Sequence, residues 1–126
     1  MAGNARVGVA LCPSSALLDG GAGVRFDTVR QGRSQPAFAI RFRGQVHAYV
    51  NACRHQQSEL DWRPGEFFDQ AKLYLVCATH GALYAPDSGV CIAGPCRGAR
   101  LLALPVQECD GHITCHQDER PESRMR

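Results

Sequence analysis

The chain has 126 residues, a formal net charge of +2 and a hydrophobic fraction of 44%. This length and composition fit one ordinary globular domain, and so small a net charge does not indicate nucleic acid or an anionic membrane as a partner. No apolar stretch approaches the roughly 20 residues that a membrane-spanning helix needs.

The start of the chain does not have the pattern of an export signal. The longest apolar run there, Val7 to Leu11, is too short for the core of a signal peptide and has no cluster of basic residues ahead of it. We therefore expect a cytoplasmic protein, in which cysteines are more often metal ligands or buried thiols than disulfides. The chain has seven cysteines, a high count, so the question is which of them bind metal.

Short apolar runs separated by turn residues recur along the chain. Residues 1–23 are rich in Gly, Ala and Ser around one apolar run, which predicts either a first strand or an ordered N-terminal arm. From Val24 onward the pattern predicts short strands over residues 37–42, 46–50, 73–76, 83–84, 101–106 and 112–115. A short helix is expected only around residues 57–61.

Turn signals such as Arg43-Gly44-Gln45 and Asp110-Gly111 separate these runs, in two cases at hairpin distance. Short strands with frequent turns are typical of an antiparallel all-β sandwich or a small barrel. We expect one all-β domain over residues 24–116. Residues 117–126 have almost nothing to bury, so we expect them to form a flexible C-terminal tail.

Two short motifs could bind metal, Cys53-Arg54-His55 and Cys77-Ala78-Thr79-His80. Each comes soon after a predicted strand, so that its loop can direct a thiolate and an imidazole at one point. One such pair would be weak evidence, because a Cys and a His two or three residues apart also occur by chance. Two pairs in loops predict a four-ligand site.

The four ligands fit either a structural zinc ion or a [2Fe–2S] cluster in which two cysteines hold one iron and two histidines hold the other. Spacing alone does not separate these two kinds of site. Zinc sites usually combine a Cys-x₂₋₄-Cys pair with a His-x₃₋₅-His pair. Here each loop supplies one cysteine and one histidine, which favours the binuclear cluster.

Around these ligands the sequence resembles the Rieske [2Fe–2S] proteins, and most closely the small ferredoxins of oxygenase systems. The first loop continues to an apolar Leu60, and the second has Gly81 after the histidine and the aromatic Tyr84 beyond it. The remaining matching segments are Asp87-Ser88-Gly89, Gly94-Pro95 and Leu104-Pro105-Val106. The resemblance extends over about residues 24–114.

The resemblance implies an antiparallel β-sandwich with a small cluster-binding subdomain over about residues 51–97, formed by the two ligand loops and the Gly-Pro loop. It implies one Rieske-type [2Fe–2S] cluster, with Cys53 and Cys77 on one iron and His55 and His80 on the other. Six residues would surround the cluster: Leu60, Gly81, Ala82, Tyr84, Gly94 and Pro95.

Some positions depart from other branches of the family. Respiratory and photosynthetic members have a disulfide between their ligand loops and a membrane helix, whereas this chain has Gln57 and Thr79 near those positions. The serine that donates a hydrogen bond to the cluster in high-potential members is Ala82 here. Tyr84 stands where those members have a tyrosine that reaches a cysteine sulfur, although it could equally be an aromatic core residue. We expect a low or intermediate reduction potential.

Five cysteines remain outside the ligand set. Cys91 and Cys96 flank the Gly-Pro loop, where they could form a local disulfide, respond to oxidation, or simply pack as two small apolar residues. Cys12, Cys109 and Cys115 are expected to be packing residues.

The expected function is one-electron transfer from a reductase to an oxygenase or similar acceptor, with no substrate of the chain's own and neither nucleic acid nor membrane as a partner. A Rieske oxygenase would need a further domain with a mononuclear iron, for which the chain is too short. Two further functions fit the same four ligands: a Rieske-like small subunit or regulatory component of a larger redox enzyme, and a zinc-stabilised interaction module.

Overall fold

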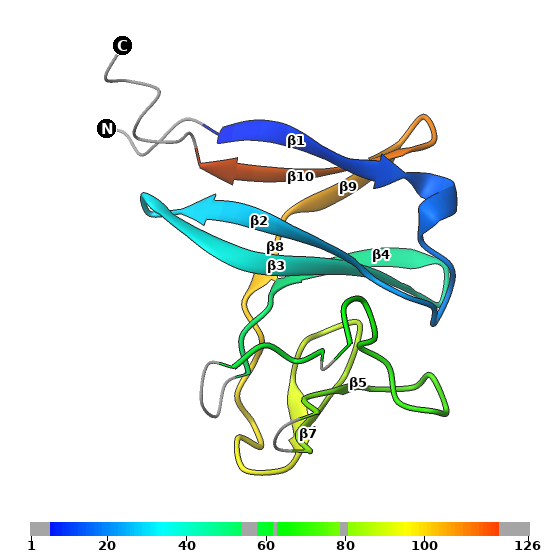
Figure 1. Ribbon diagram of the computed structural model, residues 1–126, viewed down its shortest axis with the longest axis vertical. Helices are drawn as coiled ribbons and strands as arrows, with labels where there is room; N and C mark the ends of the chain where they lie inside the picture. Colours follow the sequence, from blue (N-terminus) through cyan, green and yellow to red (C-terminus); the bar gives the residue numbers. More distant parts are fainter. Residues whose placement is uncertain (1–5, 54–57, 62, 79–80, 119–126) are drawn as a thin grey trace.

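We describe a computed structural model of the chain, in which residues 6–53, 58–61, 63–78 and 81–118 are placed. Within these residues the strands form three antiparallel sheets (Figure 1). The first sheet has the order β1-β10-β9 and the second the order β2-β3-β4-β8, and these two lie against each other. The third, β5-β6-β7, lies at one end of the molecule. The expected all-β antiparallel fold is confirmed.

The elements have the following bounds: β1 Arg6–Pro13, the 3-10 helix η1 Ser14–Ala16, β2 Val24–Arg30, β3 Arg33–Phe42, β4 Gln45–Val50, β5 Leu75–Val76, β6 Leu83–Tyr84, β7 Cys91–Ala93, β8 Ala103–Leu104, β9 Val106–Cys109 and β10 His112–Asp118. No helix among the described residues is long and apolar enough to cross a bilayer.

Strand β3 is buried on both faces between residues 37 and 40, because it lies inside the second sheet with further layers on either side. Phe38 and Ile40 point into a core that also contains the cluster-binding end of the chain, whereas Ala37 and Ala39 point into the core between the two large sheets. Side chains alternate along a strand, so one strand serves both cores. The ring of Phe38 stacks on that of Phe67 at 4.0 Å.

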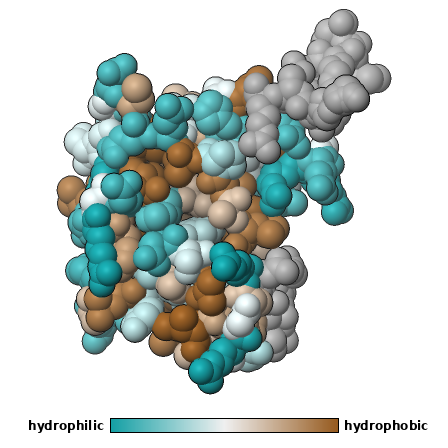
Figure 2. All heavy atoms as spheres, turned by 180° about the vertical axis from the view of Figure 1, so that it is seen from behind, coloured by the Kyte–Doolittle hydropathy of each residue, from teal (hydrophilic) through white to brown (hydrophobic). Residues whose placement is uncertain are grey.

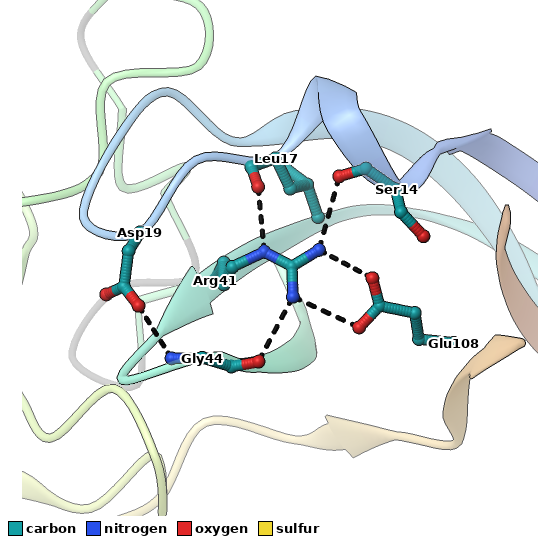
Figure 3. A network of polar contacts seen from close by, with 6 residues as sticks. All are labelled: Ser14, Leu17, Asp19, Arg41, Gly44 and Glu108. Carbon is teal, nitrogen blue, oxygen red and sulfur yellow. Dashed lines mark hydrogen bonds and ion pairs between the residues drawn. The ribbon is translucent and has the colours of Figure 1, made fainter. Parts of the chain in front are cut away.

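Arg41 connects the two large sheets (Figure 3). From β3 it donates hydrogen bonds to the backbone oxygens of Ser14, Leu17 and Gly44, and both of its terminal nitrogens bond the carboxylate of Glu108 in β9, at 3.0 and 2.7 Å. A planar guanidinium is suited to binding a carboxylate through two nitrogens, because its donors form a fixed fork that matches the two carboxylate oxygens. The carboxylate of Asp19 accepts from the amides of Arg43 and Gly44 and so holds the β3–β4 turn.

Two predicted strands are shorter than expected. Of residues 73–76 only Leu75 and Val76 form β5, because the side chain of Asp69 accepts hydrogen bonds from the amides of Leu73 and Tyr74 and holds them in a turn. The predicted strand over 101–106 is interrupted at Pro105, which has no amide hydrogen, and its C-terminal part belongs to β9.

The expected helix is absent from its described part, residues 58–61. Ser58 instead accepts a hydrogen bond from the amide of Cys53, and the amide of Leu60 donates to the side chain of Asn51. These contacts replace the hydrogen bonds that a helical turn would make. Gln57 lies outside the described residues.

The two ends of the chain pair with each other. Strand β1 lies in the segment for which the sequence predicts either a strand or an arm, and it pairs antiparallel with β10. The expectation of a flexible tail from residue 117 is wrong for its first two residues, because Gln117 and Asp118 belong to β10 and accept hydrogen bonds from the amides of Val29 and Gln31. Residues 119–126 lie outside the described residues.

Exposed hydrophobic side chains are distributed over several elements. On the face seen in Figure 2 they occur as separate groups among hydrophilic ones. The large hydrophobic residues with the most exposure are Val7, Leu18, Leu73, Ile92 and Leu102.

The bond between Arg41 and Glu108 predicts acid sensitivity. The hydrogen bond from Arg41 lowers the pKa of Glu108 to about 2, from an ordinary value of 4.5. The unfolded chain therefore takes up a proton at higher pH than the folded one, so this pair stabilises the fold fully above about pH 4.5 and loses its effect as the pH falls toward 2. The free energy of unfolding, measured with urea, should differ most between wild type and Glu108→Gln at neutral pH.

The difference in the free energy of unfolding between wild type and Glu108→Gln should shrink as the pH falls from 4.5 to 2. The exposed Glu66→Gln variant controls for the loss of one negative charge. A difference between wild type and Glu108→Gln that stays constant over the whole range would contradict the assignment.

Candidate metal centre

The first ligand loop leaves β4 and is fixed by hydrogen bonds at both ends. Cys53 lies three residues after the strand, is fully buried, and donates its amide hydrogen to Ser58 O at 2.7 Å. Asn51, which is 1% exposed, accepts from the amide of Leu60 and donates to the carboxylate of Asp61. A buried amide side chain with both ends bonded holds the loop in one conformation.

The second ligand loop leaves β5 directly. Cys77 is also fully buried, its amide donates to Ala82 O at 2.9 Å, and its carbonyl accepts from the amide of Gly81 at 2.7 Å. Gly81 has φ +71°, which closes this tight turn. The amide of Ala78 donates to Leu60 O at 3.0 Å, so the two ligand loops are bonded directly to each other.

The structure therefore brings both predicted cysteine ligands into one apolar core. The predicted histidine ligands, His55 and His80, lie outside the described residues and stay a prediction. Among the residues that are placed, no three His, Cys, Asp or Glu side chains form a group that could hold a metal. No competing metal site is thus present in the described part of the chain.

Tyr84 is fully buried in β6, and its hydroxyl oxygen lies 3.3 Å from the sulfur of Cys53 and 3.1 Å from that of Cys96. The ring of Tyr84 belongs to the hydrophobic core, and its hydroxyl lies within hydrogen-bonding distance of a predicted ligand, so the two sequence interpretations are compatible. A hydroxyl at this distance can donate to a ligand thiolate.

The Gly-Pro loop packs on the second ligand loop. Gly94 has φ +104°, and a Cβ placed there would come within 2.9 Å of the Cα of Ala82. Ala82 is fully buried, whereas Gly94 and Pro95 are exposed. The loop thus covers Ala82 on one side and faces solvent on the other. Close contact of this kind requires glycine.

Cys91 and Cys96 are brought together as thiols, with 3.2 Å between their sulfur atoms. Burial and the neighbouring thiol of Cys96 raise the pKa of Cys91 to about 11. Cys12, Cys109 and Cys115 lie in the β1-β10-β9 sheet instead. Burial is also the main cause that raises the pKa of Cys12 and Cys115.

Sequence reasoning missed Asn51, although a signal was present. A polar residue directly after an apolar strand, next to a loop with several unpaired amides, often bonds the backbone of that loop. Tyr49 was missed as well; it donates its hydroxyl hydrogen to Pro86 O at 2.7 Å and so anchors the turn after β6. Burial raises the pKa of Tyr49 to about 12.

The two buried cysteines, Cys53 and Cys77, and the Tyr84 hydroxyl fit an iron–sulfur cluster. Two buried cysteines from separate loops meet in an apolar core, and thiolates in such surroundings need a metal to carry their charge. A buried tyrosine hydroxyl lies within hydrogen-bonding distance of one of the two sulfurs. The fold and these loops together define a small antiparallel β domain with two buried, loop-borne cysteines at one end.

The model of the Rieske [2Fe-2S] domain family matches residues 9–115, and the chain belongs to this family. The cofactor of the family is the Rieske-type [2Fe–2S] cluster, as the sequence predicted. A search of curated proteins gave no match.

Solved structures show the same fold. The ferredoxin of carbazole 1,9a-dioxygenase from Nocardioides aromaticivorans IC177 is similar with a TM-score of 0.69 and 22% identity, over 90% of this chain and 99% of that one. The Sphingomonas yanoikuyae B1 ferredoxin is similar with a TM-score of 0.64 and 24% identity, over 90% of this chain and 99% of that one. The terminal oxygenase of carbazole 1,9a-dioxygenase from Novosphingobium sp. KA1 is similar with a TM-score of 0.73 and 20% identity, over 94% of this chain and 32% of that one.

The contact between Gly94 and Ala82 can be tested with a matched pair of variants. Gly98 also has positive φ, +92°, but an added Cβ there would meet nothing within 4 Å. Gly98→Ala should therefore lower the free energy of unfolding by backbone strain alone, about 1 to 3 kcal/mol. Gly94→Ala should add an overlap with the second ligand loop that costs about 1 to 3 kcal/mol more. Equal effects in urea unfolding would contradict a close packing role for Gly94.

Proposed function

We propose that the chain is a one-electron carrier whose single [2Fe–2S] cluster is held by Cys53 and Cys77 on one iron and by His55 and His80 on the other. When bound, the cluster takes up and releases one electron, and its two neutral imidazole ligands raise the reduction potential above that of an all-cysteine cluster. The residues expected around it are Leu60, Gly81, Ala82, Tyr84, Gly94 and Pro95.

The observation that carries this proposal is the position of the two ligand loops. Their cysteines are buried, yet each loop reaches the surface within a few residues, at Ala78 and Gly81 in the second loop and at Glu59 in the first. The Gly-Pro loop beside them is exposed as well. A centre placed so near the surface gives a docked partner a short path for an electron.

The polar groups near the sulfurs support a low or intermediate reduction potential. Ala82 has no hydroxyl to offer a cluster sulfur, whereas Tyr84 lies 3.3 Å from the sulfur of Cys53. Hydrogen bonds to sulfur stabilise the more negative reduced cluster. Because Ala82 lacks the hydroxyl that high-potential Rieske centres have at this position, the potential should lie below theirs.

A reductase is the proposed donor, and an oxygenase or similar redox protein the proposed acceptor, with cytoplasm as the compartment. Among the similar structures is a complex of reduced oxygenase and oxidised ferredoxin in carbazole 1,9a-dioxygenase. The match to ferredoxins extends over nearly their whole length. This supports an electron carrier of the ferredoxin kind, and we propose that it has no substrate of its own.

A second candidate is a Rieske component or regulatory subunit of a larger redox enzyme. It is supported by the similarity to a terminal oxygenase, which is as high as the similarity to ferredoxins. Purification of the protein from its natural source separates the two. A carrier should migrate at the size of a small protein, whereas a subunit should migrate with a larger partner.

The cluster itself is tested by metal analysis and spectroscopy of the anaerobically purified protein. We expect a brown protein with two irons and two sulfides per chain, and a rhombic EPR signal after reduction by dithionite. Cys77→Ala should lose iron and colour, while Cys115→Ala, which removes an equally buried thiol from the other core, should keep both.

A colourless protein with stoichiometric zinc, which gains no cluster on reconstitution, would favour the zinc-stabilised interaction module. In that case the electron-carrier proposal fails. Loss of iron in Cys115→Ala as well would show only that the fold is fragile, so circular dichroism of both variants accompanies the metal analysis.

A further inference from the structure

Four side chains form a continuous line from the Gly-Pro loop to a predicted cluster ligand. The sulfur of Cys91 lies 3.2 Å from that of Cys96, the Cys96 sulfur lies 3.1 Å from the hydroxyl oxygen of Tyr84, and this oxygen lies 3.3 Å from the sulfur of Cys53. Cys91, Tyr84 and Cys53 are all buried. A chemical change at the thiols of Cys91 and Cys96 therefore takes place next to the Tyr84 hydroxyl, which contacts the sulfur of Cys53.

The hydrogens of this line are limited. Cys91 donates its thiol hydrogen to Ala93 O, and Cys96 donates its own to the sulfur of Cys91. Tyr84 has a single hydroxyl hydrogen, and among the described residues the sulfurs of Cys53 and Cys96 lie within reach of it. While Cys96 is a thiol, these two sulfurs compete for the tyrosine hydrogen.

We propose that Cys91 and Cys96 are a dithiol–disulfide couple, and that formation of the disulfide raises the reduction potential of the cluster through the hydroxyl of Tyr84. A disulfide bond is about 2.05 Å long, so the two sulfurs move together by about 1.1 Å from their 3.2 Å separation. The Cys96 sulfur, held in the disulfide, then competes less for the tyrosine hydrogen, and the hydrogen bond to Cys53 becomes stronger. A stronger hydrogen bond to a ligand sulfur raises the potential.

The backbone holds the two cysteines ready for this reaction. The amide of Cys91 donates to Ala99 O and its carbonyl accepts from the amide of Gly98, while the carbonyl of Cys96 accepts from the amide of Ala99. These bonds close the loop between the cysteines. Cys91 is paired with Tyr84 in the ladder of β6 and β7, so the sulfur of Cys96 is the one that we expect to move when the disulfide forms.

The oxidant we propose is a low-molecular-weight disulfide. The partly exposed Cys96 loses its proton and its thiolate attacks one sulfur of the disulfide, which forms a mixed disulfide and releases one thiol. Cys91 then loses its proton and attacks the Cys96 sulfur, which forms the Cys91–Cys96 bond and releases the second thiol. The chain loses two electrons and two protons, and the small disulfide gains both as two thiols.

Accessibility decides the order of these steps. Cys91 is 1% exposed and its pKa is raised to about 11, so it forms little thiolate on its own. Cys96 can be reached from solvent. This inference rests on the cluster of the proposed function, but the disulfide itself requires neither the cluster nor a partner protein.

The test uses the cluster-loaded protein, equilibrated anaerobically with mixtures of reduced and oxidised glutathione. Remaining thiols are alkylated and peptides are analysed by mass spectrometry, while the absorption spectrum verifies that the cluster stays intact. The potential of the dithiol and disulfide forms is then measured by optical titration with thiol-free mediators. Cys96→Ser removes the couple. Cys12→Ser is the matched control, because it removes a thiol of the same intermediate exposure from the distant β1-β10-β9 sheet.

We expect a peptide linked through Cys91 and Cys96, the loss of two alkylatable thiols, and a higher potential in the disulfide form. Cys12→Ser should behave like wild type. Tyr84→Phe should form the same disulfide, but its two forms should have equal potentials, because the hydroxyl that connects the couple to Cys53 is gone. Cys96→Ser should form no such link and show one potential in all mixtures.

Three results would overturn the inference. The first is no Cys91–Cys96 link although the exposed Cys109 becomes glutathionylated, which proves that the oxidant was active. The second is a potential that falls or does not change when the link forms. The third is an equal shift in Tyr84→Phe. A chain without a cluster would refute the proposed function, whereas the linked peptide would still report on the couple.

Discussion

The two-sided burial of strand β3 is the constraint on which the rest of the structure depends. Its large side chains, Phe38 and Ile40, form the core around the ligand loops, and its small ones, Ala37 and Ala39, allow the two large sheets to approach. A shift of one residue would exchange these two faces and place phenylalanine between the sheets. Arg41 at the end of the same strand fixes the sheets to each other by its bonds to Glu108 and to three backbone oxygens.

The proposed metal centre is an extension of this core. Cys53 and Cys77 are buried among the same apolar residues as Phe38, and the loops that carry them bond each other through Ala78 and Leu60. Asn51 supplies the polar contacts that a loop without regular structure needs in order to be buried. The positions of the two cysteines are therefore set mainly by the packing of the domain, together with these few hydrogen bonds.

Tyr84 joins the two functions that we propose for this end of the molecule. Its ring fills the core, and its hydroxyl lies between the sulfur of a cluster ligand and the sulfur of a loop thiol. A hydroxyl in such a position can, as we propose, couple a change in one sulfur to the other. The Gly-Pro loop packs through Gly94 on Ala82 of the second ligand loop, so it lies beside the proposed centre.

The sequence by itself determined the all-β class, most of the strands and the family with its cofactor, because alternation of apolar residues and the spacing of Cys and His are local patterns. It did not determine features made by residues far apart. The pairing of β10 with β1 brings Gln117 and Asp118 into a strand, the side chain of Asp69 shortens β5, and Asn51 replaces an expected helix. The line from Cys91 to Cys53 likewise needs three segments to meet. Only the tertiary structure decides such contacts, since each depends on partners that no local pattern specifies.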